Sequence, residues 1–217
     1  MSVVNTIKPT EHVFIAGMTG CGKSVLAEVF LAGYESVIKL DTKGEVHERR
    51  RDGLSAWRGL VEGEDFTVVE HLADLDKAET GKIIFAPVWE ENNEDTYNEL
   101  CKYVFLQGDT ILWIDELMTV CKNSFAMPDY MRAILTAGRS RGAVLWMLTQ
   151  RPSGIPALCI ASSTHFFVFT LPQPQDRKKM VDVTSCPLLM DKPKKYVFWY
   201  FKEGMDEDGA RMATLKL

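Results

Sequence analysis

The chain has 217 residues, of which 46% are hydrophobic and 25% charged, and its formal net charge is −5. This composition excludes a disordered or fibrous chain, no apolar run is long enough to cross a bilayer, and the N-terminus lacks a signal-peptide pattern. The length suits one α/β domain, which we expect to span residues 1–217. The five cysteines show no paired metal-ligand spacing, which favours reduced thiols in a soluble, cytoplasmic protein.

The first predicted element is a buried strand followed at once by a glycine loop and a helix. The apolar run 12–16 has the length of such a strand, and residues 25–32 read as a helix that Gly33 ends. Between them stands a phosphate-loop pattern of two glycines five residues apart, then a lysine and a hydroxyl residue. Its members are Gly17, Met18, Thr19, Gly20, Cys21, Gly22, Lys23 and Ser24.

A phosphate loop binds a triphosphate through backbone N–H groups that glycine lets point inward, aided by the positive end of the helix dipole. In this chain Lys23 would reach the β- and γ-phosphates and Ser24 would hold Mg²⁺, so we predict ATP and Mg²⁺ as ligands. The alternative is a glycine-rich turn with an incidental Lys-Ser pair. Cys21 is either a small filler residue of the loop or an oxidisable thiol.

The alternation of strands and helices continues through the middle of the chain. A second strand over 36–41 leads into a polar turn ending at Glu45, and the arginine-rich stretch up to Arg58 reads as helical. Short strands at 66–70 and 83–87 follow, with a charged helical segment between them. A helix that Gly108 ends is predicted from apolar residues spaced along one face, namely Tyr97, Leu100, Cys101, Val104 and Phe105.

The strand predicted over 110–115 ends in the second chemical motif. Four apolar residues, 111–114, are followed by Asp115 and Glu116, whose side chains point in different directions and can take separate tasks. Asp115 would hold Mg²⁺ through water, and Glu116 would polarise the water that attacks the γ-phosphate. The alternative is a buried strand that ends in two solvated acids.

A third motif follows a helix that begins near Pro128. The strand over 143–149 ends in Gln150, Arg151 and Pro152. Gln150 would lie beside the γ-phosphate and bind it or the attacking water, unless it only caps the strand. A short helix and a strand over 164–170 come next.

The last two strand-like runs, 195–201 and 211–217, are joined by an acidic turn over 203–209 and predict a hairpin. Alternating strands and helices imply a mainly parallel sheet covered on both faces. We therefore expect an α/β fold, a three-layer P-loop NTPase of the RecA/ASCE-like type, with the C-terminal β-hairpin at one sheet edge.

The order of these motifs resembles the FtsK–HerA superfamily of DNA-translocating ATPases over roughly residues 12–170. The resemblance rests on the phosphate loop, the Asp-Thr-Lys-Gly-Glu turn at 41–45, the strand 111–116 and the Thr-Gln-Arg-Pro sequence at 149–152. The short chain, without a membrane anchor or a barrel domain ahead of the loop, is most similar to compact genome-packaging ATPases of tailless, membrane-containing double-stranded DNA viruses.

That resemblance implies a homo-oligomer, a hexameric ring with nucleotide between subunits. An arginine of one subunit would reach the neighbour's γ-phosphate, and Arg139 and Arg141 are the candidates, with Arg141 preferred; both are otherwise plain surface arginines. Asp41 and Glu45 would assist water placement or signalling between subunits, or simply cap their turn. The implied partners are double-stranded DNA, bound without sequence preference, and a capsid vertex or portal, in the host cytoplasm or the virion.

Three alternatives stay open at this point. The first is a cellular or plasmid translocase of the same superfamily. The second is a small-molecule kinase, which Glu116 and the 149–152 motif disfavour. The third is an assembly or secretion ATPase of the filamentous-phage type that never acts on DNA, and the net acidity keeps this alternative open. For DNA contacts in a channel, residues 49–51 and 122–123 are weak candidates.

Overall fold

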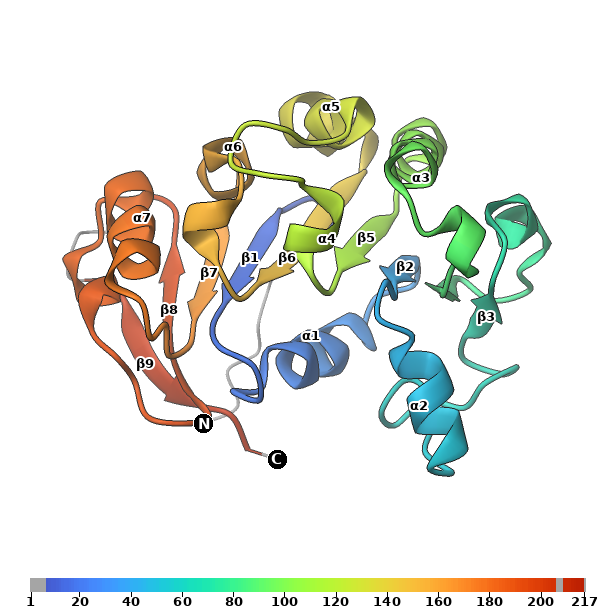
Figure 1. The fold of residues 1–217 in the computed structure, drawn as a ribbon, viewed down its shortest axis with the longest axis horizontal. Helices are drawn as coiled ribbons and strands as arrows, with labels where there is room; N and C mark the ends of the chain where they lie inside the picture. Colours follow the sequence, from blue (N-terminus) through green and yellow to red (C-terminus); the bar gives the residue numbers. More distant parts are fainter. Residues whose placement is uncertain (1–6, 206–208, 217) are drawn as a thin grey trace.

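The structure, a computed structural model, describes residues 7–205 and 209–216. Within these residues nine strands form one sheet in the order β3-β4-β2-β5-β6-β1-β7-β8-β9 (Figure 1). The strands are β1 (Val13–Ala16), β2 (Val37–Leu40), β3 (Thr67–Val69), β4 (Lys82–Phe85), β5 (Ile111–Ile114), β6 (Val144–Thr149), β7 (His165–Val168), β8 (Val197–Lys202) and β9 (Arg211–Thr214).

In the order of the sheet, all neighbouring strands from β3 at one edge to β7 are parallel. The last two pairs, β7 with β8 and β8 with β9, are antiparallel. The expected parallel sheet with a hairpin at one edge is therefore confirmed. The strand β6 lies between β1 and β5, with Ala16 opposite Thr149 and Ile114 opposite Met147. Because these strands run in parallel, the phosphate loop and the second and third motifs all follow strand ends at the same edge of the sheet.

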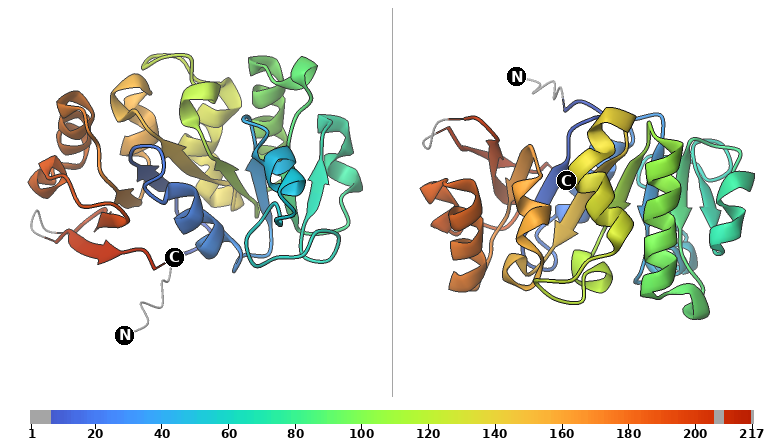
Figure 2. Two further views of the ribbon diagram at one scale, coloured as in Figure 1. Left: turned by 60° about the horizontal axis from the view of Figure 1, so that its bottom comes forward. Right: turned by 90° about the horizontal axis from the view of Figure 1, so that it is seen from above.

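Helices cover both faces of the sheet, with α1 and α2 on one face and α3, α5, α6 and α7 on the other (Figures 1 and 2). The α-helices are α1 (Lys23–Leu31), α2 (Glu45–Arg51), α3 (Glu94–Gln107), α4 (Leu117–Val120), α5 (Asp129–Ala137), α6 (Ala157–Ala161) and α7 (Pro174–Thr184). The 3₁₀ segments are η1 (Leu72–Lys77), η2 (Trp89–Glu91), η3 (Gly138–Arg141), η4 (Pro152–Gly154) and η5 (Pro187–Met190).

Each central strand contributes side chains to two hydrophobic cores, one on each face of the sheet, because successive side chains of a strand point to opposite faces. In β5, Leu112 and Ile114 belong to the core under α3 and α5, while Ile111 and Trp113 belong to the core around α1. This explains why the strand reads as a continuous apolar run instead of an alternating one. No helix in the described part of the chain is both long enough and apolar enough to span a bilayer.

The structure differs from the sequence-based prediction in the helix before Arg58 and in α7. The helix expected up to Arg58 ends at Arg51, since the chain turns at Gly53, whose φ of 71° suits glycine best. The charged helical segment predicted between β3 and β4 is present as the 3₁₀ helix η1. The helix α7 was not predicted, and the predicted turn over 203–209 lies partly outside the described residues.

A buried ion cluster joins α1 to α2. Glu28 in α1 is 1% exposed, and its carboxylate lies 2.8 Å from Arg49 Nη1 and 3.2 Å from Arg58 Nε. Lys39 of β2 is equally buried, with its Nζ 3.8 Å from Glu28 Oε1 and 3.1 Å from Glu45 Oε2. Since Glu45 and Arg49 belong to α2, the cluster fixes the two helices to each other.

Candidate functional site: three motifs at the carboxyl edge of the sheet

The phosphate loop connects β1 directly to α1, as the sequence predicts. Gly20 and Gly22 have φ values of 71° and 105°, a left-handed backbone that glycine adopts without strain. A Cβ atom on Gly22 would lie 2.6 Å from Leu215 Cδ2. The loop therefore requires glycine both for its backbone conformation and for its close packing.

The hydroxyl of Ser24 donates a hydrogen bond of 2.7 Å to Asp115 Oδ1. This contact brings the first motif and the second motif together across the intervening strand β6. A hydroxyl and a carboxylate side by side are the oxygen ligands that Mg²⁺ prefers, so the residues present fit the predicted metal.

A chain of hydrogen bonds links the other predicted residues. Thr19 Oγ1 donates to Gln150 Oε1 at 2.7 Å, and Gln150 Nε2 donates to Glu116 Oε2 at 3.0 Å. Glu116 is 8% exposed, and its Oε1 accepts from the N–H of Met118 at the start of α4. The side chain proposed to polarise water is thus held on both oxygens and anchored to the phosphate loop through Gln150.

Lys23 is folded back on its own loop. Its Nζ donates to the carbonyl oxygens of Gly17 at 2.7 Å and Met18 at 3.1 Å. Burial lowers the pKa of Lys23 from its ordinary value, and the charges of Glu116 and Asp115 oppose this shift only in part. The ammonium is therefore poorly solvated and satisfied by two carbonyls, an arrangement that a triphosphate would relieve.

Sequence reasoning missed one residue of the site, Lys43. Its Nζ lies 3.5 Å from Asp115 Oδ2 and 3.5 Å from Glu116 Oε2. The residue lies in the turn after β2, whose neighbour in the sheet is β5. The signal in the sequence is the lysine of the 41–45 turn, which follows a strand of the same sheet.

Those two acids act within the turn. Asp41 is 4% exposed, and its carboxylate accepts hydrogen bonds from the N–H groups of Lys43 at 3.2 Å and Val46 at 2.8 Å. Glu45 pairs with Lys39 in the buried ion cluster. The contacts favour the capped-turn interpretation for Asp41, whereas Glu45 contributes to the ion cluster instead.

The candidate arginines lie away from the phosphate loop of the same chain. Arg139 and Arg141 precede β6 in η3, at the opposite end of the strand from Gln150. Arg139 donates to the carbonyl of Ser162 at 2.9 Å, and Arg141 lies 4.8 Å from the centre of the Phe105 ring. A finger that acts on a neighbouring subunit has no contact to show within one chain, so its identity stays a prediction.

Arg151 and Cys21 have structural contacts. Arg151 Nε donates to Asp176 Oδ2 at 2.9 Å, and Asp176 is fully buried in α7, so Arg151 fixes the segment after Gln150.

Cys21 is 2% exposed, and burial raises the pKa of its thiol. A buried thiol with a raised pKa is a poor target for oxidation, which favours the filler interpretation.

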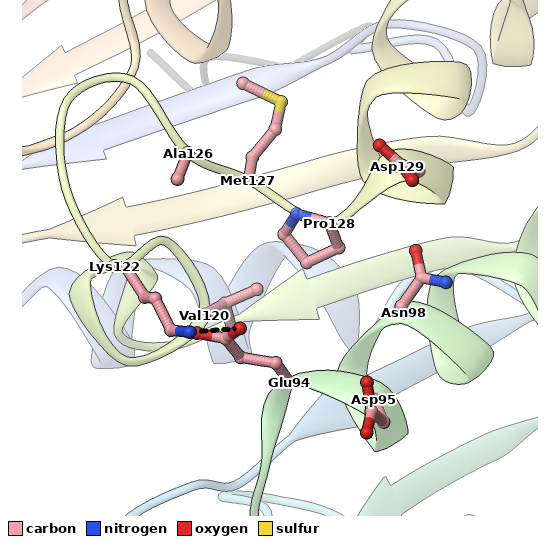
Figure 3. Close-up of a pocket in the computed structure, with 9 residues that line it drawn as sticks. All are labelled: Glu94, Asp95, Asn98, Val120, Lys122, Ala126, Met127, Pro128 and Asp129. Carbon is pink, nitrogen blue, oxygen red and sulfur yellow. Dashed lines mark ion pairs between the residues drawn. The ribbon is translucent and has the colours of Figure 1, made fainter.

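A separate pocket lies beside the site. Its cavity of about 240 Å³ is bounded by the start of α3 and the loop from α4 to α5 (Figure 3). Carboxylates of Glu94, Asp95 and Asp129 line it, and Lys122 pairs with Glu94. No residue of the phosphate loop lines this pocket, and its acidic lining does not suit a triphosphate.

The fold is similar to that of several solved structures, although no family model and no curated protein matches the sequence. The genome packaging NTPase B204 of Sulfolobus turreted icosahedral virus 2, in complex with AMPPCP, is 18% identical with a TM-score of 0.71, and the match covers 95% of this chain and 98% of that one. The conjugation coupling protein TcpA of pCW3 is 17% identical with a TM-score of 0.59, over 94% of this chain and 60% of that one.

A further match is the N-terminal domain of zonular occludens toxin from Neisseria meningitidis. It is 12% identical with a TM-score of 0.53, over 95% of this chain and 94% of that one. These similarities confirm the P-loop NTPase fold that the resemblance to FtsK–HerA packaging ATPases implied.

Proposed function

We propose that this chain hydrolyses ATP to move double-stranded DNA, as a genome-packaging motor of a double-stranded DNA virus. The observation that carries the proposal is the set of contacts across three strand ends. Ser24 meets Asp115, and Thr19 meets Glu116 through Gln150. The residues that would bind the triphosphate and the residue that would activate water thus lie next to one another.

Binding would begin at the N-terminus of α1. The N–H groups of the loop and the helix dipole attract the phosphates. Lys23 would exchange the two loop carbonyls for β- and γ-phosphate oxygens, which pair its buried charge better. Mg²⁺, held by Ser24 and Asp115, would neutralise charge on the same phosphates.

In hydrolysis, a water oxygen attacks the γ-phosphorus and the bond to the β–γ bridging oxygen breaks, so ADP leaves with the electron pair of that bond. Glu116 accepts the proton of the water and later releases it to phosphate or solvent. Gln150 keeps the Glu116 carboxylate in place and offers its amide to the water or the γ-phosphate.

The sheet order also supports one orientation of the nucleotide. The water-activating groups follow β5 and β6, on one side of β1, so the γ-phosphate would lie on that side. The nucleoside would leave toward the other side, where β7, β8 and β9 lie. There Tyr196 Cδ1 and Leu215 Cδ2 lie 3.5 Å and 2.6 Å from the Cβ position of Gly22, and they would border the base.

The motor would be a homo-oligomer, a hexameric ring in the host cytoplasm or the virion, docked at a capsid vertex or portal. Arg141, or else Arg139, would stabilise transition-state charge in the neighbouring subunit's site. The segment η3 precedes β6, so it lies at the end of this strand that is opposite to the phosphate loop. An arginine there lies away from the site of its own chain, which is compatible with action on a neighbouring subunit.

DNA contacts are the least constrained part of the proposal. The three arginines of α2 pair with acids of this chain, since Arg49 meets Glu28, Arg50 meets Glu62 and Arg51 meets Asp52. This makes them poor candidates for gripping phosphates. Together with the net charge of −5, it favours as the alternative an assembly or secretion ATPase that does not act on DNA.

The test is the steady-state ATPase rate with and without double-stranded DNA, at low and moderate salt. A motor that grips the phosphate backbone should be stimulated by DNA, and salt should weaken the stimulation. Glu116→Gln should bind ATP without turning it over. DNA-independent hydrolysis at every protein concentration would support the alternative, and near-normal turnover by Glu116→Gln would refute the assignment of the water-activating residue.

A further inference from the structure

The turn after β2 presents an ammonium group to both acids of the second motif. β2 and β5 are parallel neighbours with Leu40 opposite Ile114, so the residues that follow these strands leave the sheet side by side. Lys43 Nζ lies 3.5 Å from a carboxylate oxygen of Asp115 and 3.5 Å from one of Glu116. In the described part of the chain, no other cation forms an ion pair with these two acids.

The backbone of this turn is fixed, while the lysine side chain is free to move. The buried carboxylate of Asp41 binds the N–H groups of Lys43 and Val46, and Gly44 has a φ of 73°, which favours glycine. The Lys43 side chain itself is 46% exposed. A rigid base under a flexible four-carbon stem lets the ammonium move without any refolding of the turn.

The charges indicate where it would move. With Lys23 turned onto its own loop, Lys43 forms the ion pairs that reduce the mutual repulsion of the two adjacent carboxylates. While it does so, it also occupies the Glu116 oxygen that Gln150 contacts. A triphosphate on the loop brings more negative charge than either acid, and its γ-end would lie on this side of β1.

We propose, on the basis of the ATPase function above, that Lys43 is a further catalytic residue. It bridges Asp115 and Glu116 in the empty site and passes to the γ-phosphoryl group when ATP binds. The transfer frees the Glu116 carboxylate to accept a proton from water. It also adds a positive charge where charge develops in the transition state. ADP, which lacks the γ-phosphoryl group, would leave Lys43 on the acids.

The experiment compares Lys43→Ala and Lys43→Arg with a matched control, Lys102→Ala. Lys102 is a similarly exposed lysine in an ion pair with Glu99 on α3, outside the site. ATP turnover and the affinities for ATP and ADP, by displacement of a fluorescent ADP, are measured for each variant. Thermal unfolding monitors the fold.

Lys43→Ala should lose turnover by about a hundredfold and most of its preference for ATP over ADP, with ADP affinity unchanged within about threefold. Lys43→Arg should restore the preference, and Lys102→Ala should behave as the parent. The proposal would be overturned if Lys43→Ala kept turnover within about threefold of the parent, or if its ratio of ATP affinity to ADP affinity were unchanged. Such a result is expected of a lysine that forms only a surface ion pair, because such a pair contributes little. If Glu116→Gln is inactive in the same assay, the proposed function survives that result; if the parent never hydrolyses ATP, both proposals fall.

Discussion

His12, which directly precedes β1, makes the stability of this fold depend on pH. The side chain is fully buried, and its Nδ1 accepts a hydrogen bond of 2.9 Å from the N–H of Leu145 in β6. Burial, reinforced by the charge of Arg139, lowers the pKa of His12 to about 4. The folded chain therefore keeps the imidazole neutral at a pH where the unfolded chain already takes up a proton.

The sign and size of the effect follow from proton linkage. Above the ordinary histidine pKa of about 6.5, His12 is neutral in both the folded and the unfolded chain, and its contribution to the free energy of unfolding is fully present. This contribution is lost as the pH falls toward about 4. This gap corresponds to roughly 3 kcal/mol of unfolding free energy. Other groups titrate in the same range, so the contribution of His12 must be isolated by a variant.

His12→Asn is the suitable variant, because its amide oxygen can accept the bond from Leu145 but does not titrate. Urea unfolding, followed by tryptophan fluorescence, is measured for both proteins from pH 7 down to about pH 4. The stability advantage of the parent over the variant should shrink by roughly 3 kcal/mol across this range. Two curves that stay parallel would refute the reasoning that the buried imidazole is the source of the acid sensitivity.

Two further predictions concern the nucleotide. Tyr196→Ala should raise the KM for ATP about tenfold, because it loses a contact with the base. The kcat and the inhibition by inorganic triphosphate should stay unchanged. If inhibition by triphosphate weakens as much as ATP binding does, Tyr196 lies at the phosphates instead. Arg141→Ala should lose turnover by at least about a hundredfold. Mixing it with Glu116→Gln should restore part of the activity, because some interfaces then have both groups intact; a mixture as inactive as its components would argue against action in trans.

The parts of the fold that follow from short-range patterns were predictable from the sequence. The strand that ends in Asp115 and the loop that ends in Ser24 have local signals, namely a continuous apolar run and fixed glycine spacing. The hairpin of β8 and β9 and the parallel sheet followed from the alternation of elements. Their contacts, such as that between Ser24 and Asp115, then follow from the order of the strands.

Other features depend on long-range contacts that no local pattern encodes. The helix α7 has no clear apolar stripe, because its buried face includes the charged residues Asp176 and Arg177. Asp176 accepts hydrogen bonds from Arg151 and Ser153, and Arg177 Nη1 donates to the carbonyl of Leu171. The contact of Lys43 with the acids after β5 likewise required knowledge of which strand lies beside β2.

The ion cluster around Glu28 gives the site a mechanical property. α1 begins at the phosphate loop and α2 begins at the lysine turn, and Arg49 clamps one helix to the other through a carboxylate that is almost fully buried. Removal of one partner would leave an unpaired charge in the interior, at a cost of about 3–5 kcal/mol, so the cluster holds the two helices in one relative position. Because α1 follows the phosphate loop and α2 follows Gly44, the same ion pairs also hold the loop and the turn that carries Lys43 at a fixed separation.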